Sequence, residues 1–285
     1  MRLAYRNPKR ASRAHEQYRM RILEAIGGDP NRGHIFRTME STRIKLEAID
    51  YVEGLGNLSE HQFDFYRRSV EAIHHGDLYL VDDPKTGRLF NNFTNLWSDL
   101  RPYLRIGGEE VCEIDIANSQ PLLAASLYPE GSEERPRYLE VVLEGSFYRE
   151  LEAASGLKCP DYKKLKKLVF KQVFFGRNGK GANRPLLRAF MNLFPELYLI
   201  IQNMKKVHKN RLALKLQSIE AYLVIGKVVD RLRLLGVPCL TVHDSIVCKV
   251  SDEEVAYEAL DAELEKLIGH RCHIKIKSHA RLNAA

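Results

Sequence analysis

Residues 239–250, Cys-Leu-Thr-Val-His-Asp-Ser-Ile-Val-Cys-Lys-Val, constrain the fold more than any other stretch of the chain. Two β-branched runs flank a polar tip, and apolar residues alternate along them, which is typical of a β-hairpin. The tip holds Asp244 on rigid strands yet close to solvent. That position suits a metal ligand, provided that a second carboxylate approaches it. It also suits an aspartate that only caps a turn, because Asp is frequent in turns.

The second carboxylate is expected from Asp115 in the stretch 111–120, Val-Cys-Glu-Ile-Asp-Ile-Ala-Asn-Ser-Gln, where an apolar, β-like run ends near the acid. Helices are predicted from about Ser12 to a Gly27-Gly28 stop, over 38–53, and from Ser59 to His75, where Ser59 and Gln62 have capping-box spacing. Further helices are predicted over 119–157 with a break at 129–136, and over 184–206, 208–235 and 252–268, before a closing strand at 273–277. Strands before, between and after helices predict one α+β domain with helical additions.

A helix from about 160 to 175 is the most informative of these. Its apolar residues fall on one face, whereas Lys163, Lys167 and Lys171 recur at intervals of four residues on another. Like charges at this spacing repel one another, so the face indicates either an anionic partner or a solvated basic surface. The glycine-rich basic loop that follows, at 176–181, lacks the pattern of a P-loop.

A hairpin is predicted from Leu78 onward, with Pro84 and Gly87 in its turn. Arg88 lies where this turn ends and the next strand begins, and it is followed by Asn91-Asn92 and Asn95. An arginine in this position is either solvated or reaches into a minor groove, with the asparagines as further donors.

The formal net charge of +7 and the pI near 9.1 favour polyanionic partners. The five cysteines are odd in number and form no C-x-x-C pair, which indicates reduced, mostly buried thiols in an intracellular protein. No apolar run approaches a membrane span, so no membrane partner is expected. The Arg-rich amino terminus fits a DNA-contacting arm, a solvated helix face or a mitochondrial transit peptide. A bacterial or phage-like cytoplasmic location is expected, with a mitochondrial one left open.

Three segments in chain order resemble the palm and fingers motifs of family A, bacterial DNA polymerase I-like, DNA polymerases. They are Asp115 with Ser119-Gln120, the lysine helix ending in Phe175-Gly176, and Val242-His243-Asp244. Related motifs occur in single-subunit phage and mitochondrial RNA polymerases. Thr86-Gly87-Arg88-Leu89 with Asn95 is similar to the family's primer-strand contact segment, and Phe194-Pro195 and Gln217 also have counterparts. The resemblance covers roughly 80–285.

The resemblance implies a polymerase-type palm, an antiparallel sheet with a catalytic hairpin, together with helical fingers. The implied parts are a thumb-like or arm-like helical region at 1–77, the palm at 78–118 and 206–285, and the fingers at 119–205. It also implies a primed template nucleic acid and nucleoside triphosphates as partners, with an accessory protein supplying processivity.

The resemblance further implies a role for each matching residue. Asp115 and Asp244 would hold two Mg²⁺ ions, with Mn²⁺ as a substitute, and Lys167 would act in catalysis. The implied nucleotide-binding residues are Lys163, Lys167, Lys171, Phe175 and Gln120. The implied nucleic-acid-binding residues are Arg88, Asn95, Gln217 and His243.

Several departures from the family leave the choice of sugar open. Ser245 stands where DNA polymerases usually carry Glu, Gln120 where they carry the Glu that excludes a ribose hydroxyl, and Phe175 where Tyr is usual. Even with these departures, the resemblance implies a primer-extending nucleotidyltransferase that uses two metal ions, most closely a minimal DNA polymerase without an exonuclease. An RNA-synthesising or primase-like enzyme and an inactive nucleic-acid-binding homologue are the alternatives. A two-metal nuclease suits the lysine helix less well.

Overall fold

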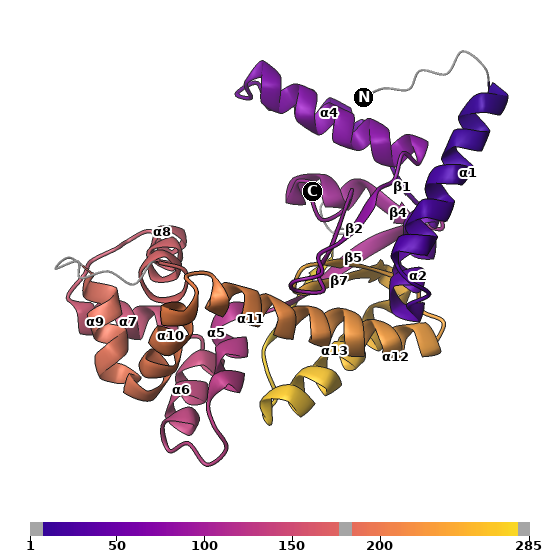
Figure 1. Ribbon diagram of the computed structural model, residues 1–285. Helices are drawn as coiled ribbons and strands as arrows, with labels where there is room; N and C mark the ends of the chain where they lie inside the picture. Colours follow the sequence, from indigo (N-terminus) through magenta and orange to yellow (C-terminus); the bar gives the residue numbers. More distant parts are fainter. Residues whose placement is uncertain (1–7, 177–183, 279–285) are drawn as a thin grey trace. The chain divides into compact units, whose positions relative to one another are not determined.

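The computed structural model describes residues 8–176 and 184–278 (Figure 1). The chain divides into two compact units whose segments interleave in sequence. The first unit comprises 1–115, 224–259 and 276–285, and the second comprises 116–223 and 260–275. The predicted α+β class is confirmed, with a curled antiparallel sheet and many helices.

The main sheet belongs to the first unit and has six strands. Its order is β1-β4-β5-β7-β6, and β8 also pairs with β5. The strand bounds are β1 Thr42–Ile44, β4 Leu104–Ile106, β5 Glu109–Ile116, β6 Cys239–Val242, β7 Ser245–Lys249 and β8 Ile274–Ser278. The predicted hairpin at 239–250 is confirmed, since β6 and β7 pair antiparallel through a two-residue turn.

The sheet forms much of the core of the first unit. Directly paired residues of an antiparallel sheet point to the same face, so Cys112, Cys248 and Cys239 form a buried row across three strands. All five cysteines are buried thiols, as the sequence predicts. Helix α2 (Pro30–Ser41) packs against β6 and α12 (Val229–Leu234) through a buried apolar stripe.

The helices of the amino-terminal third are α1 (Pro8–Ala25), α2, α3 (Glu47–Gly54) and α4 (Glu60–His75). The capping box predicted at the start of α4 is confirmed, because the Ser59 hydroxyl accepts from the Gln62 N–H and the Gln62 side chain accepts from the Ser59 N–H. The single helix predicted over 38–53 is wrong. It is broken by β1, whose residues 42–44 pair with β4 instead of continuing the helix.

The predicted hairpin after Leu78 is also confirmed. It consists of β2 (Leu80–Asp82) and β3 (Leu89–Asn91), with Leu80 opposite Asn91. The Asp83 carboxylate braces the turn by accepting from the Lys85 N–H at 3.1 Å and the Thr86 hydroxyl at 2.6 Å. The 3₁₀ helix η1 (Ser98–Tyr103) then leads into β4.

The second unit is mainly helical, and its core is rich in buried aromatic rings that include Tyr138, Phe147 and Phe190. Its predicted helices are present, with a break at Phe194-Pro195. The bounds are α5 Ser119–Ala124, η2 Ala125–Leu127, α6 Glu134–Leu143, α7 Phe147–Ser155, α8 Tyr162–Val169, η3 Phe170–Phe174, α9 Pro185–Leu193, α10 Pro195–Val207 and α11 Arg211–Ala221.

Three helical segments near the carboxyl end complete the fold. They are the π-helical η4 (Tyr222–Val228), the 3₁₀ turn η5 (Val250–Asp252) and α13 (Glu253–Ile268). Within the described part of the chain, no helix combines the length and the apolar character that crossing a bilayer requires.

Candidate active site

The two aspartates singled out in the sequence lie on neighbouring strands of the first unit. Asp115 of β5 is directly opposite Ser245 of β7, and Asp244 precedes Ser245 in the turn between β6 and β7. Directly opposed residues in an antiparallel pair have Cα atoms roughly 5 Å apart, so the backbone of Asp244, next to Ser245, lies close to that of Asp115 at one end of the sheet. Asp115 and Asp244 are both half-buried.

The turn itself is held in an unusual backbone conformation. His243 has φ of 55°, in the left-handed region that non-glycine residues seldom adopt. Ser245 is 2% exposed, and its hydroxyl donates to the Val242 carbonyl at 3.0 Å, which closes the turn from inside. The Ser245 side chain is therefore a brace of the hairpin.

His243 connects the turn to the basic residues of the same unit. Its ring meets the Phe90 ring edge to face, with centroids 6.2 Å apart. Burial lowers the pKa of His243, and the positive charges of Arg88 and Arg101 lower it further. Arg88 and Arg101 thus lie close enough to His243 to act on its charge, at the turn that also carries Asp244.

Asp115 belongs to an alternating chain of charges that the sequence reading missed. The Lys277 ammonium on β8 donates to Asp115 Oδ2 at 3.1 Å and to Glu113 Oε1 at 2.9 Å. Glu113 Oε2 in turn accepts from Arg101 at 2.6 Å. Burial alone would raise the pKa of Glu113, but Arg101 and Lys277 outweigh it and hold that pKa below its usual value.

This pair of aspartates fits a divalent metal of the magnesium type. Mg²⁺ is usually bound by one or two carboxylates, and water and substrate phosphates fill its other positions. The described residues contain no group of three or more His, Cys, Asp and Glu side chains that could form a complete protein cage. The Lys277 ammonium already lies on Asp115 as a stand-in cation, so this carboxylate is oriented to receive positive charge.

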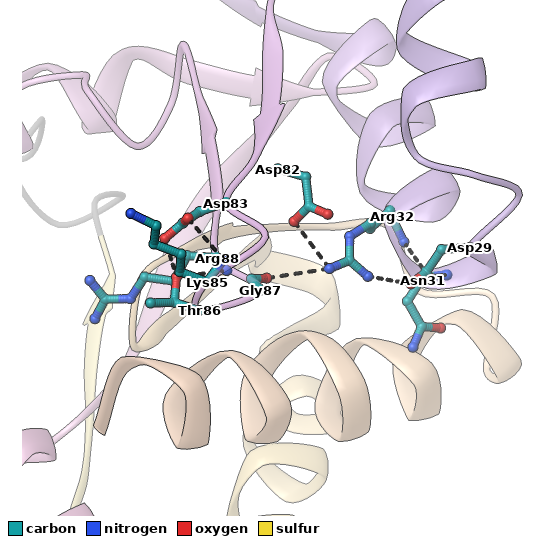
Figure 2. Close-up of polar contacts among 9 residues, drawn as sticks. All are labelled: Asp29, Asn31, Arg32, Asp82, Asp83, Lys85, Thr86, Gly87 and Arg88. Carbon is teal, nitrogen blue, oxygen red and sulfur yellow. Dashed lines mark hydrogen bonds and ion pairs between the residues drawn. The ribbon is translucent and has the colours of Figure 1, made fainter. Parts of the chain in front are cut away.

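Arg88 lies on the β2–β3 hairpin, which a second arginine anchors to α2 (Figure 2). Arg32 of α2 forms an ion pair with Asp29, donates to Asp82 of β2 at 3.1 Å, and reaches the Gly87 carbonyl in the turn at 3.5 Å. Figure 2 shows the Arg88 guanidinium extending away from these contacts. The anchor thus fixes the turn and leaves Arg88 to point elsewhere.

The three asparagines after the hairpin differ in role. Asn91 and Asn92 are buried. Asn91 accepts from backbone N–H groups of its own turn, and Asn92 bonds to backbone groups of residues 77 and 79, so the alternative in which these two act as nucleic-acid donors is wrong. Asn95 is exposed, and its amide donates to the hydroxyl of Tyr79. Asn95 is therefore the one of the three that lies on the surface.

In the second unit, the lysine helix has the two faces that the sequence predicts. Leu165, Val169 and Val173 are fully buried. Lys163, Lys167, Lys171 and Phe175 are exposed, and among the described residues no carboxylate pairs with these three lysines. The Asp161 side chain caps the helix start by accepting from two backbone N–H groups. A row of uncompensated ammonium groups on a rigid helix is suited to bind a polyanion such as a triphosphate.

The end of this helix widens into the π-helical turn η3. The turn stacks the Phe175 ring on the Phe170 ring, with centroids 5.6 Å apart and planes within 6° of parallel. A side chain at Gly176 would place its Cβ 2.1 Å from the Lys171 carbonyl oxygen, so this position requires glycine. Buried Lys205 of α10 donates to the Val173 carbonyl at 2.6 Å, and burial lowers the pKa of Lys205 to about 8.

Gln120 and Gln217 are linked through a residue that the sequence reading did not select. The Gln120 amide donates to the Glu220 carboxylate at 2.9 Å, and Glu220 is 1% exposed on α11. Gln217 lies three residues earlier on the same helix and is half-buried. The contact therefore places Gln120 against the helix that carries Gln217.

The structure thus groups the selected residues within each unit. Asp115, Asp244, His243 and Arg88 gather in the first unit, and Lys163, Lys167, Lys171 and Phe175 share one helix face in the second. The missed residues left only faint signals. Glu113 and Lys277 each sit two residues from another charge in an alternating strand, whereas Arg101 gives no signal in the sequence.

Comparisons with known proteins support the fold. No protein-family model matches the chain, and no curated protein matches it in sequence. Among solved structures, the chain is similar to the POL domain of Pol1 from M. smegmatis, which was solved in complex with DNA primer-template and dNTP. The TM-score is 0.56 at 11% sequence identity, and the match spans 81% of this chain and 55% of that one. The chain therefore has a polymerase palm-like fold.

Proposed function

We propose that this protein is a template-directed nucleotidyltransferase that extends a nucleic-acid primer, most closely a minimal DNA polymerase. The observation that carries the proposal is the register of β5 and β7, which brings Asp115 beside the Asp244 turn. The palm-like fold supports it, since the similar POL domain was solved with DNA primer-template and dNTP. The proposed partners are the same two ligand classes.

Asp115 and Asp244 would hold two Mg²⁺ ions. The bound metal would activate the primer 3′-hydroxyl and neutralise the triphosphate during in-line transfer. His243, Arg88 and the exposed Asn95 would contact the primer–template near the reacting end. Because these groups read backbone and minor-groove features, the contacts would not depend on sequence.

The helical second unit would bind the incoming nucleotide. Lys163, Lys167 and Lys171 would neutralise the triphosphate, and Lys167 would stabilise the charge that develops on the departing pyrophosphate and protonate it. The Phe175 ring, already stacked on Phe170, would support the nascent base pair. Gln120 would lie near the sugar, and Gln217 would contact the minor groove. The first unit would then be the palm and the second the fingers.

Primer extension on a labelled primed template tests the proposal, with Mg²⁺ and parallel reactions containing dNTPs or rNTPs. Wild type is expected to elongate the primer, and Asp115→Asn and Asp244→Asn should each lose at least about 1,000-fold in rate, since each removes a charged group used in the transition state. Asp50→Asn, an exposed carboxylate on α3, is the matched control and should be as active as wild type. No incorporation by wild type, or equal rates in all variants, would contradict the proposal.

An RNA-synthesising enzyme on the same palm is the second candidate, and Ser245 favours it. The position where DNA polymerases usually carry Glu is here a buried hydroxyl that braces the turn. Elongation with rNTPs, above all without a primer, would select this candidate. Tight duplex binding without incorporation would instead indicate a homologue that binds nucleic acid only.

A further inference from the structure

The ammonium of Lys277 occupies a position that the proposed reaction does not explain. It lies between Asp115 Oδ2 at 3.1 Å and Glu113 Oε1 at 2.9 Å, and its side chain is 48% exposed. Asp115 is the proposed metal ligand, so the Lys277 ammonium lies on one oxygen of a carboxylate that a divalent cation would also bind. Two positive charges cannot both occupy one carboxylate oxygen without strong repulsion.

Glu113 gives Lys277 a second, permanent partner. The Glu113 side chain is only 4% exposed, and Arg101 holds its other oxygen at 2.6 Å. Glu113 and Asp115 are two residues apart on β5, so both project from the same face of the strand. An ammonium has three donors, and therefore Lys277 can release Asp115 while it stays bonded to Glu113.

We propose that Lys277 is a resident counter-cation that competes with divalent metal for Asp115 and moves onto Glu113 alone when metal binds. This inference rests on the proposed function, because it takes Asp115 to be a metal ligand. Lys277 is a positioning residue in this role. It holds the Asp115 carboxylate in a fixed orientation before metal arrives, and it sets the metal concentration at which the site fills.

Titration of the metal-free protein with Mn²⁺, followed by the loss of the free Mn²⁺ signal in electron paramagnetic resonance, tests the proposal at fixed pH. Lys277→Gln is expected to bind Mn²⁺ about tenfold more tightly than wild type, because a unit positive charge a few ångströms from the metal is removed. Lys277→Arg keeps the charge and should bind within about twofold of wild type.

Lys45→Gln is the matched control for the loss of a charge. Lys45 is exposed directly after β1, which β4 separates from β5, and among the described residues no carboxylate pairs with it. This variant should also bind Mn²⁺ within about twofold of wild type, since its charge lies two strands away from β5 and is screened by solvent. Equally tighter Mn²⁺ binding in both glutamine variants would overturn the proposal, because the change in affinity would then follow from net charge alone.

A second readout separates competition from simple damage to the fold. Without metal, Lys277→Gln should melt at a lower temperature than wild type, because Asp115 and Glu113 lose their shared partner. Saturating Mn²⁺ should then raise its melting temperature by more than it raises that of wild type, since tighter binding gives more stabilisation. An equal or smaller rise would overturn the proposal.

Asp115→Asn distinguishes failure of this inference from failure of the proposed function. If Asp115→Asn weakens Mn²⁺ binding while Lys277→Gln leaves it unchanged, the counter-cation role is wrong and the proposed metal site stands. If Asp115→Asn binds Mn²⁺ as tightly as wild type, Asp115 is not a ligand, and both proposals fail together.

Discussion

At the scale of single residues, the environment of Ser245 decides how its departure from the polymerase pattern should be interpreted. Its hydroxyl is buried and bonds across the hairpin to the Val242 carbonyl at 3.0 Å. Asp115 faces it directly on β5. The position therefore combines burial with a neighbouring negative charge, which is an unfavourable place for a second carboxylate.

We expect Ser245→Glu to destabilise the protein and not to improve DNA synthesis. Burying a carboxylate beside Asp115 should lower the free energy of unfolding by about 3 kcal/mol or more. Ser245→Ala, which loses only a hydrogen bond, should cost about 1 kcal/mol. Urea unfolding followed by circular dichroism measures both. A Ser245→Glu variant as stable as wild type would show that the side chain reaches solvent or metal instead.

At the scale of elements, local signals in the sequence predict local structure well. The capping box at Ser59 and the Asp83–Gly87 turn are fixed by neighbouring residues, and both form as expected. The helix predicted over 38–53 fails because β4, some sixty residues away, pairs with residues 42–44. Long-range pairing is also what brings Lys277 to Asp115, and no short pattern contains that information.

The residues of the candidate site likewise fall into those that a local sequence pattern predicts and those that only long-range pairing brings together. The face shared by Lys163, Lys167 and Lys171 follows from helical periodicity, which the sequence displays directly. The register that sets Asp115 opposite Ser245 depends on which strands become neighbours. Glu220 was not identified because a buried carboxylate on a helix is recognised only through its partner, here Gln120.

The anchoring of the β2–β3 hairpin by α2 gives a prediction at this scale (Figure 2). Arg32→Ala removes the contacts to Asp82 and Gly87, so the hairpin should open more often and hold Arg88 less firmly. We expect about fivefold weaker binding of primer–template, together with faster amide exchange in β2 and β3. Fluorescence anisotropy and hydrogen exchange measure the two effects.

Arg37→Ala is the control, because Arg37 is an exposed arginine on the same helix. It removes the same charge, and the hairpin should keep its protection. If both variants bind primer–template equally weakly and neither changes amide exchange, α2 contributes only its charge to binding. The contacts of Arg32 with the hairpin would then play no part in function.

At the scale of the whole molecule, the formal net charge of +7 and the local lysine face have different consequences. Net charge acts on duplex affinity through counterion release, which depends on how many phosphates are neutralised. A row of three ammonium groups on one helix acts only on the ligand that contacts it. Replacing lysines in two different places at equal charge therefore separates the two effects.

We expect Lys163→Gln combined with Lys167→Gln and Lys171→Gln to lower kcat/KM for nucleotide incorporation by at least about 100-fold, because the developing phosphate charge loses its counter-ions. The matched variant replaces three exposed lysines elsewhere, Lys45, Lys206 and Lys209, and reaches the same formal net charge of +4. At saturating primer–template, the control variant should incorporate nucleotide at a rate within about threefold of wild type. The salt dependence of duplex binding should be alike in both variants, because they carry the same net charge. The contrary result is a salt dependence of duplex binding that falls mainly in the lysine-face variant, with nucleotide incorporation reduced only as much as duplex binding is. In that case the helix binds duplex instead of triphosphate, and the nucleotide role proposed for Lys167 is wrong.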